Sequence, residues 1–341
     1  MNRNAALDGL RGCAILLVIF FHAGVPGFAG GFVGVDIFFV LSGFLITSLL
    51  MDEIERTGTL DFVAFYMRRA LRLYPALLLM LAAYIIAGAR FWPTEPRPFH
   101  ALIAGLYLTD YSRAYFGIPT TIEHTWSLAI EEHYYLIWPL LLIAIARWPR
   151  RARITFLIAL YALATAWRIY RAGHAEWDVV YHSFDSHCSG LLAGSLAAQF
   201  RKDDAAGWRE RALALAVCAG ATAVPLLLAT AAVRTSLFGL PAIVMEFLSA
   251  FVIFMLLNRK SLAWRIFAFP PLVWTGTISY ALYLWHGPLL KAYGYDEQHL
   301  WPDLPIALAL IFGIAIFSWF AVERPAQALR HRWTRAAPAP A

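Results

Sequence analysis

Residues 7–51, LDGLRGCAILLVIFFHAGVPGFAGGFVGVDIFFVLSGFLITSLLM, decide the fold. They contain two apolar runs, 10–26 and 31–51, each roughly long enough to cross about 30 Å of hydrocarbon as a helix. Because so few residues separate the runs, the two helices must pack antiparallel. A basic N-terminus before an apolar run is also typical of a signal peptide, but a second run so close behind favours a retained first span.

The rest of the chain has the same character. Hydrophobic residues make up 60% and charged residues 15% of the 341 positions, with a mean hydropathy of +0.60. A soluble globular protein would struggle to stay in solution with this balance, so we expect the lipid bilayer as partner. The net charge of +6 comes from short basic clusters between apolar runs, which indicates membrane topology and no nucleic-acid partner.

The hydropathy pattern predicts an all-α fold, a polytopic integral membrane helical bundle of about ten transmembrane helices. The run 100–110 is expected to be re-entrant or interfacial, because a span there would move the basic group 147–153 away from the other basic clusters. The positive-inside rule then places both termini in the cytoplasm. We expect a membrane domain over 1–325 and a short, disordered cytoplasmic tail over 326–341. The spans are expected near 10–26, 31–51, 71–90, 132–147, 153–171, 186–200, 211–233, 236–257, 271–290 and 304–322.

Ionisable side chains fall in or beside these spans, where each charge costs about 2.5–3.5 kcal/mol on insertion scales. Such residues usually face a cavity and mark function. The sequence thus predicts two clusters of different chemistry at opposite ends of one bundle. The outer cluster includes His22, Asp36, Glu131, Glu132, Asp185 and His286, and the inner cluster includes Arg11, Arg68, Arg69 and Arg72.

His22 is the candidate base of the outer cluster. It follows Arg11 by eleven residues, about 16 Å of helical rise, and histidine is well suited to take a proton from a hydroxyl near neutral pH. Asp36 is expected to reach His22, because the short loop brings both to the same end of two antiparallel helices. The carboxylate would then fix the imidazole tautomer. A histidine that only hydrogen-bonds a neighbouring helix is the alternative.

The inner arginines occur in FYMRRALRLYP. Arg68 and Arg72 are at i, i+4 and Arg69 and Arg72 at i, i+3, so one helix face presents at least two guanidinium groups. Paired guanidinium forks are the geometry that phosphate recognition favours. Anchoring at the membrane surface and contact with anionic lipid is the alternative reading, and the two are compatible.

Further candidates lie between these clusters. The glycine-rich stretch 30–43 indicates close helix packing, with a lining role for Ser42 as the alternative. Trp126 has the place of an interfacial anchor. Glu131 and Glu132 enter a span together, and since adjacent helical residues point in different directions, at least one is expected to face the bundle.

Polar groups at the same depth on other spans complete the outer cluster. They are Asp185, at the opening of the sixth span, and His286, late in the ninth. Histidines and carboxylates can ligate metal ions, but no HExxH or comparable spacing occurs, so we expect no metal.

Several blocks, in order along 7–325, resemble acyltransferase family 3 of membrane-bound O-acyltransferases. The resemblance implies a multi-pass enzyme of the plasma membrane, the bacterial inner membrane. Such enzymes move acyl groups, commonly acetyl, from cytoplasmic acyl-CoA to sugar hydroxyls of surface or lipid-linked glycans, and some acylate antibiotics such as macrolides. It implies acyl-CoA as co-substrate and no permanently bound cofactor. The blocks are LDGLRG with His22 following, GGFVGVDIFFVLSGFLI, FYMRRALRLYP, TWSLAIEEHYYLIWP, DSHCSGLLAG, ISYALYLWH and VERP.

The resemblance also implies roles for single residues. Arg11 and His22 match the family's arginine and catalytic histidine, Asp36 its second-span aspartate, and Arg69 and Arg72 its paired arginines near the donor site. The hypothesis is that the phosphates of acyl-CoA dock on the arginines, with Arg68 beside them, and His22 acts as general base on an acceptor hydroxyl. The oxyanion donor is to be sought among Ser42, Trp126 and a backbone amide.

Two other classes of protein compete with this reading. A proton-coupled secondary transporter would use the buried histidine and carboxylates as a relay, but such proteins often show paired halves, and no internal repeat is evident. A scaffold or receptor gives no reason for an outer histidine together with an inner arginine cluster. The acceptor, the acyl chain and the oligomeric state do not follow from the sequence.

Overall fold

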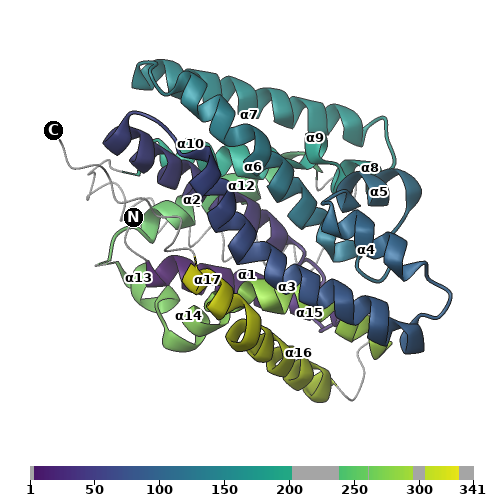
Figure 1. Cartoon of the computed structure of the whole chain (residues 1–341). Helices are drawn as coiled ribbons and strands as arrows, with labels where there is room; N and C mark the ends of the chain where they lie inside the picture. Colours follow the sequence, from purple (N-terminus) through teal and green to yellow (C-terminus); the bar gives the residue numbers. More distant parts are fainter. Residues whose placement is uncertain (1–3, 202–237, 260, 295–303, 330–341) are drawn as a thin grey trace.

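The computed structural model describes residues 4–201, 238–259, 261–294 and 304–329. Within these residues every regular element is a helix (Figure 1), which confirms the predicted all-α fold. The helices are α1 (Ala5–His22), α2 (Val33–Thr57), α3 (Phe62–Phe91), α4 (Arg97–Gly105), α5 (Thr109–Phe116), η1 (Glu123–Thr125), α6 (Trp126–Ile145), α7 (Arg150–Ala172), α8 (Trp177–His182), α9 (Phe184–His187), α10 (Ser189–Ala198), α12 (Leu240–Met255), α13 (Leu262–Phe267), α14 (Pro270–Thr277), α15 (Ser279–Ala292), α16 (Leu304–Ser318), the π-helical turn η3 (Trp319–Glu323) and α17 (Arg324–Ala328).

Local signals in the sequence set the ends of the first helices. Asn4 caps α1, and Asp61 caps α3, each by accepting a hydrogen bond from a backbone N–H of the first turn. Helix α2 ends at Gly58, whose φ of +75° lies in the left-handed region that glycine adopts without steric cost. The result is a tight connection that places the arginines of α3 beside the end of α2.

Among the residues that the structure describes, six helical stretches are long and apolar enough to cross a membrane: α1, α2, α3, the η1–α6 stretch, α7 and Leu304–Ala328. Two shorter apolar helices, α10 and α12, accompany them. The chain is therefore a multi-pass helical membrane protein. The total of about ten spans and the cytoplasmic termini stay predictions. The span expected at 211–233 and the tail beyond residue 329 lie outside the described residues.

Some helix boundaries differ from those expected from hydropathy. The expected span 271–290 is two helices that meet at Ile278. Just before the break, the hydroxyls of Thr275 and Thr277 donate to carbonyls four residues earlier, a pattern that often bends helices. The sixth span is also divided, into α9 and α10. The run 100–110 holds the end of α4 and the start of α5, and a nine-residue helix of about 14 Å is too short to cross.

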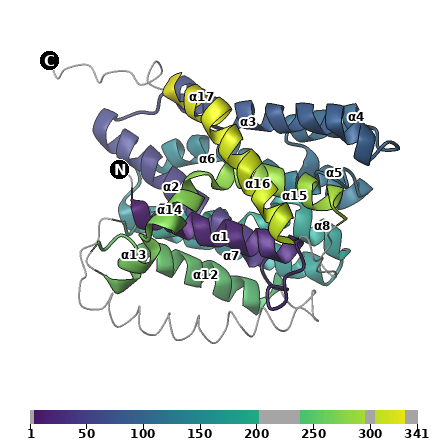
Figure 2. The ribbon, with the colours of Figure 1, turned by 90° about the horizontal axis from the view of Figure 1, so that it is seen from below.

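Small residues let the helices approach closely, as predicted for the glycine-rich stretch. A Cβ on Gly43 would lie 1.9 Å from the carbonyl oxygen of Leu191 in α10, and a Cβ on Gly34 would lie 2.4 Å from that of Ala14 in α1. Helix α1 thus packs into the bundle between α2 and α14. Figure 1 shows α7 and α16 at opposite edges of this bundle, and Figure 2 shows α3 and α12 on opposite sides.

Candidate active site

One deep cavity, of about 900 Å³, is lined by residues of α1, α2, α3, α6 and α15, with Tyr107 from the α4–α5 connection. Its lining residues on α2 extend from Val35 to Thr57, about 33 Å along the helix axis at 1.5 Å per residue. That length equals roughly the thickness of the hydrocarbon core. The cavity therefore runs along nearly the whole of α2.

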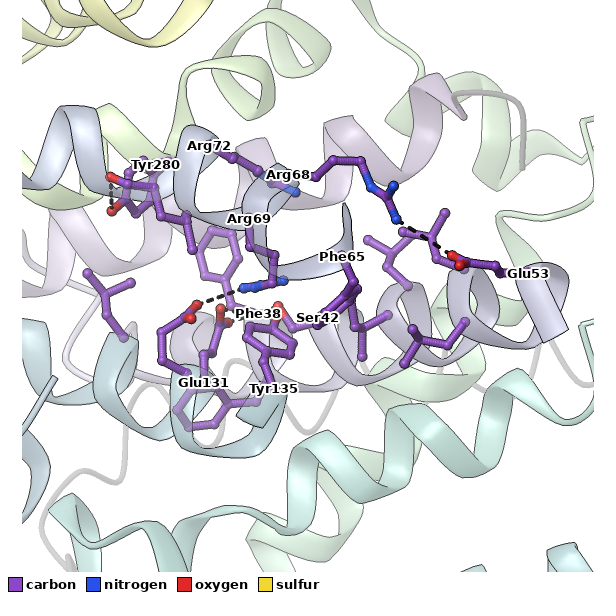
Figure 3. Close-up of a pocket in the computed structure, with 18 of the residues that line it drawn as sticks. Phe38, Ser42, Glu53, Phe65, Arg68, Arg69, Arg72, Glu131, Tyr135 and Tyr280 are labelled. Carbon is purple, nitrogen blue, oxygen red and sulfur yellow. Dashed lines mark hydrogen bonds and ion pairs between the residues drawn. The ribbon is translucent and has the colours of Figure 1, made fainter. Parts of the chain in front are cut away.

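We call the part of the cavity lined by guanidinium groups the arginine end, since Arg56 and the Arg68–Glu53 pair lie at the last turns of α2. Its guanidinium groups belong to Arg11, Arg56, Arg68 and Arg72. Arg68 Nη2 lies 3.6 Å from Glu53 Oε2, and the two side chains point toward each other in Figure 3. The structure thus places Arg11, Arg68 and Arg72, which the sequence analysis grouped, in the lining of one cavity.

Arg69 also lines the cavity, but its guanidinium is engaged by protein groups. Its Nη2 lies 2.9 Å from Glu132 Oε1, and its Cζ lies 3.3 Å from the ring centroid of Tyr135. Next to this pair, Ser42 Oγ donates to Glu131 Oε1 at 2.8 Å, and the Tyr135 hydroxyl donates to Glu131 Oε2 at 3.2 Å. Figure 3 shows Arg69, Glu131 and Tyr135 facing one another in the middle of the cavity. The two glutamates enter the bundle, and Arg69 stabilises them.

Three histidines from three elements gather beyond the other end of the cavity, and we call them the histidine cluster: His22, His124 and His286. The ring centroids of His22 and His286 are 5.0 Å apart, and those of His286 and His124 are 5.1 Å apart. Nδ1 of His22 lies 2.9 Å from the carbonyl oxygen of Val18. Since a carbonyl can only accept, Nδ1 carries the proton, and Nε2 of the neutral ring holds the lone pair that a general base needs.

Tyr283 joins the histidine cluster to the cavity. It lines the cavity, and its ring centroid lies 5.3 Å from that of His286. The Tyr283 hydroxyl donates to the carbonyl oxygen of His124 at 2.8 Å and lies 2.6 Å from Ser127 Oγ, which also lines the cavity. One continuous path of named side chains therefore leads from the arginine end to His286 and His22.

Asp36 has a partner that the sequence did not predict. Its Oδ1 lies 2.9 Å from Nε2 of His187, in α9, whereas the prediction paired it with His22. The reason is the face of α2 on which Asp36 lies. That face packs against α10, where a Cβ on Gly190 would lie within 3.8 Å of the Asp36 carbonyl oxygen, and α9 immediately precedes α10.

Two further predicted residues lie outside the cavity lining. Trp126 is buried in a group of aromatic rings, with centroids 4.8 Å from Tyr181 and 5.3 Å from His187. Asp185 accepts hydrogen bonds from Trp167 Nε1 at 2.7 Å and Arg171 Nη1 at 3.3 Å. Trp126 therefore supports the wall behind the site, and Asp185 ties α9 to α7.

The sequence did not predict His124, Tyr135 and Tyr283. All three occur in blocks that were singled out for other residues, TWSLAIEEHYYLIWP with its preceding histidine and ISYALYLWH. Tyr283 stands three residues before His286, which places it on the same helix face and was a usable signal. In the described parts of the chain, no group of three histidine, cysteine or carboxylate side chains is placed to hold a metal ion.

The helical bundle holds an interior cavity with guanidinium groups in its lining and imidazoles beyond Tyr283. These features define the class as a multi-pass membrane protein with an enzyme-like interior site. The chain belongs to acyltransferase family 3, because the model of that family's acyltransferase domain matches residues 4–323. This confirms the resemblance that the motifs indicated.

Named relatives support the same family. The chain is 30% identical to peptidoglycan O-acetyltransferase OatA of Listeria monocytogenes serovar 1/2a, over 94% of this chain and 55% of that protein. It is 31% identical to the putative peptidoglycan O-acetyltransferase YrhL of Bacillus subtilis, over 83% of this chain and 48% of that protein. It is 30% identical to O-acetyltransferase OatA of Staphylococcus aureus, over 83% of this chain and 50% of that protein. The chain spans about half the length of these relatives. No solved structure matches it.

Proposed function

We propose that this protein transfers an acyl group, most readily acetyl, from cytoplasmic acyl-CoA to a hydroxyl of a glycan. The observation that carries the proposal is a cavity lined by several arginines and, toward its other end, by Tyr283, whose ring contacts His286 of the histidine cluster. Guanidinium groups bind the phosphates of acyl-CoA, and an imidazole can deprotonate an acceptor hydroxyl. Acyl transfer from acyl-CoA to a hydroxyl requires both groups in one site.

The donor is proposed to enter at the arginine end. Arg11, Arg68 and Arg72 would contact the phosphates of acyl-CoA, and the pantetheine arm would follow the cavity along α2 toward Tyr283. Arg69 takes a different role from that implied by the resemblance. Because Glu132 and Tyr135 engage it, we assign it to positioning the two glutamates.

The reaction is proposed to occur at the histidine cluster. His22 Nε2 removes the proton of the acceptor hydroxyl as the hydroxyl oxygen attacks the thioester carbonyl. A C–O bond forms, the C–S bond breaks, and the CoA thiolate leaves with the proton returned by His22. Ser42 donates its proton to Glu131, Ser127 is engaged by the Tyr283 hydroxyl and Trp126 lies behind the site, so a backbone amide is the proposed oxyanion donor.

The acceptor is proposed to be peptidoglycan or a related surface glycan, because the relatives named above carry that substrate in their names. The proposal includes the plasma membrane as location and cytoplasmic termini, which put the arginine end on the side that holds acyl-CoA. A macrolide-type sugar is the alternative acceptor.

The test compares surface glycans of cells with the gene, without it, and with the His22→Asn variant, by mass spectrometry of O-acyl groups. We expect acyl esters only with the wild-type gene, and their mass and position name the acyl chain and the acceptor. Equal acylation in all three strains, with the variant present in the membrane, contradicts the proposal.

A further inference from the structure

The wall that closes the cavity at the histidine cluster is aromatic. Phe38 from α2 and Tyr283 from α15 both line the cavity, and their rings meet edge to face with centroids 6.5 Å apart. Behind Tyr283 lie the imidazoles of His286 and His124, with ring centroids 5.3 and 5.6 Å away. Tyr283 therefore separates the space that a donor would fill from the imidazoles.

The position of Tyr283 is fixed from both sides. Only 6% of its surface is exposed, and its hydroxyl is held by the carbonyl of His124 and by Ser127. Gly287, one turn later on α15, packs so closely that a Cβ there would lie 2.5 Å from His124 Nδ1. A ring held in this way gives the end of the cavity a definite size.

We propose that Phe38 and Tyr283 determine which acyl chains the enzyme accepts. The inference rests on the proposed function, since a thioester that reaches the histidine cluster through this cavity has to place its acyl group against the two rings. A two-carbon chain adds little volume beside the carbonyl carbon. Each further methylene has to displace a packed aromatic ring, and a single methylene in a well-packed pocket changes kcat/KM by roughly 10-fold to 200-fold.

The test measures kcat/KM for acetyl-, propionyl- and butyryl-CoA in membranes that contain the full chain. The variants are Phe38→Ala and Tyr283→Leu, with Phe65→Ala as a matched control, because Phe65 lines the same cavity near the arginines. We expect Phe38→Ala to shift the butyryl-to-acetyl ratio toward butyryl by about tenfold or more, Tyr283→Leu to shift it in the same direction, and Phe65→Ala to leave it unchanged. A ratio is independent of the amount of folded enzyme.

The inference is overturned if Phe38→Ala and Tyr283→Leu are active and keep the wild-type butyryl-to-acetyl ratio of kcat/KM. It is also overturned if Phe65→Ala shifts this ratio as much as they do. Where Phe38→Ala does not reach the membrane, Phe38→Leu and Phe65→Leu form the matched pair under the same criterion. A wild-type protein that uses none of the three donors contradicts the proposed function itself. Wild-type acetyl transfer with unshifted variants contradicts only the role of the aromatic wall.

Discussion

Arg69 holds several neighbouring side chains of the bundle in place. Its guanidinium pairs with Glu132 and lies over the ring of Tyr135, whose hydroxyl donates to Glu131. A carboxylate inside a membrane bundle needs a charge partner and hydrogen bonds to offset its desolvation. Arg69 is the residue that makes two adjacent glutamates tolerable at this depth.

A double-mutant cycle tests this positioning role. Arg69→Ala leaves Glu132 without its partner and should lower the thermal unfolding midpoint more than Glu132→Gln does. In the double variant the loss should be less than the sum, with a coupling of about 0.5–3 kcal/mol. Additive losses would contradict the pairing. Arg69→Lys should lower kcat while leaving KM for acyl-CoA near the wild-type value, since lysine lacks the planar group that stacks on Tyr135.

His22 is predicted to act in the chemistry and not in the fold. His22→Asn keeps a polar side chain of similar size, so the unfolding midpoint should stay at the wild-type value while transfer falls at least about 100-fold. His174→Asn is the matched control, because His174 also hydrogen-bonds a backbone carbonyl through Nδ1 but is exposed. Turnover by His22→Asn at the rate of the control would refute the role of His22 as base.

At the scale of elements, the packing of α2 on α10 depends on two glycines. A Cβ on Gly43 would lie 1.9 Å from the backbone oxygen of Leu191, and a Cβ on Gly194 would lie 1.9 Å from that of Val40. Neither neighbour is the end of a flexible side chain, so even alanine forces the helices apart. This contact fixes how closely α2, which also carries Ser42, approaches α10.

Gly43→Ala should therefore lower the thermal unfolding midpoint and reduce transfer together. Gly313→Ala is the control, since a Cβ on Gly313, in the middle of α16, meets nothing within 4 Å. Alanine is the better helix former by about 1 kcal/mol, so the control should be neutral or slightly stabilising. Equal midpoints for the two variants would show that the close contact of α2 with α10 is not required.

Helix α8 carries a pH-dependent contribution to stability. Burial lowers the pKa of His182 from 6.5 to about 4. The hydrogen bond to the Asp178 backbone and the nearby Asp178 carboxylate raise the pKa, but by less than burial lowers it. Arg113 also lowers it, and Glu123 raises it. In the unfolded chain the imidazole binds its proton first as pH falls, so the native state is favoured above pH 6.5 and loses this advantage as pH approaches 4.

Between pH 7.5 and pH 5, wild type should lose on the order of 1–2 kcal/mol of stability through this group. His182→Gln should show a smaller fall in unfolding midpoint over the same interval. The measurement is a thermal unfolding series at fixed ionic strength, with His174→Gln as the exposed-histidine control. An equal fall for wild type and His182→Gln would mean that His182 titrates alike in both states.

Hydropathy predicted where helices occur better than how they face one another. The apolar runs at 10–26 and 31–51 correspond to α1 and α2, and caps such as Asp61 explain helix ends. The break at Ile278 was missed because hydropathy averages over the whole apolar run and does not register the hydrogen bonds of Thr275 and Thr277 to the helix backbone. The partner of Asp36 was missed because His187 is 151 residues away in sequence, and hydropathy does not fix the rotation of a helix about its axis.

At the scale of the whole molecule, the sequence predicted two polar clusters at opposite ends of the bundle. The structure places the arginines along one cavity and puts the histidine cluster beyond its far wall, with the two glutamates between them. His124 could not be assigned from the sequence, because its contact with His286 joins distant segments. The motif blocks predicted the family, and the match of the family model to residues 4–323 confirms it. The geometry of the cavity could be seen only in the folded chain.

The central claim is that the donor enters at the arginine end and the acyl group leaves at the histidine cluster. Sealed membrane vesicles of both orientations test it directly, with labelled acetyl-CoA supplied only outside and the transferred label measured on the glycan. We predict transfer in inverted vesicles, where the cytoplasmic face is outside, and none in right-side-out vesicles or with His22→Asn. Transfer confined to right-side-out vesicles, or undiminished with His22→Asn, would contradict the claim.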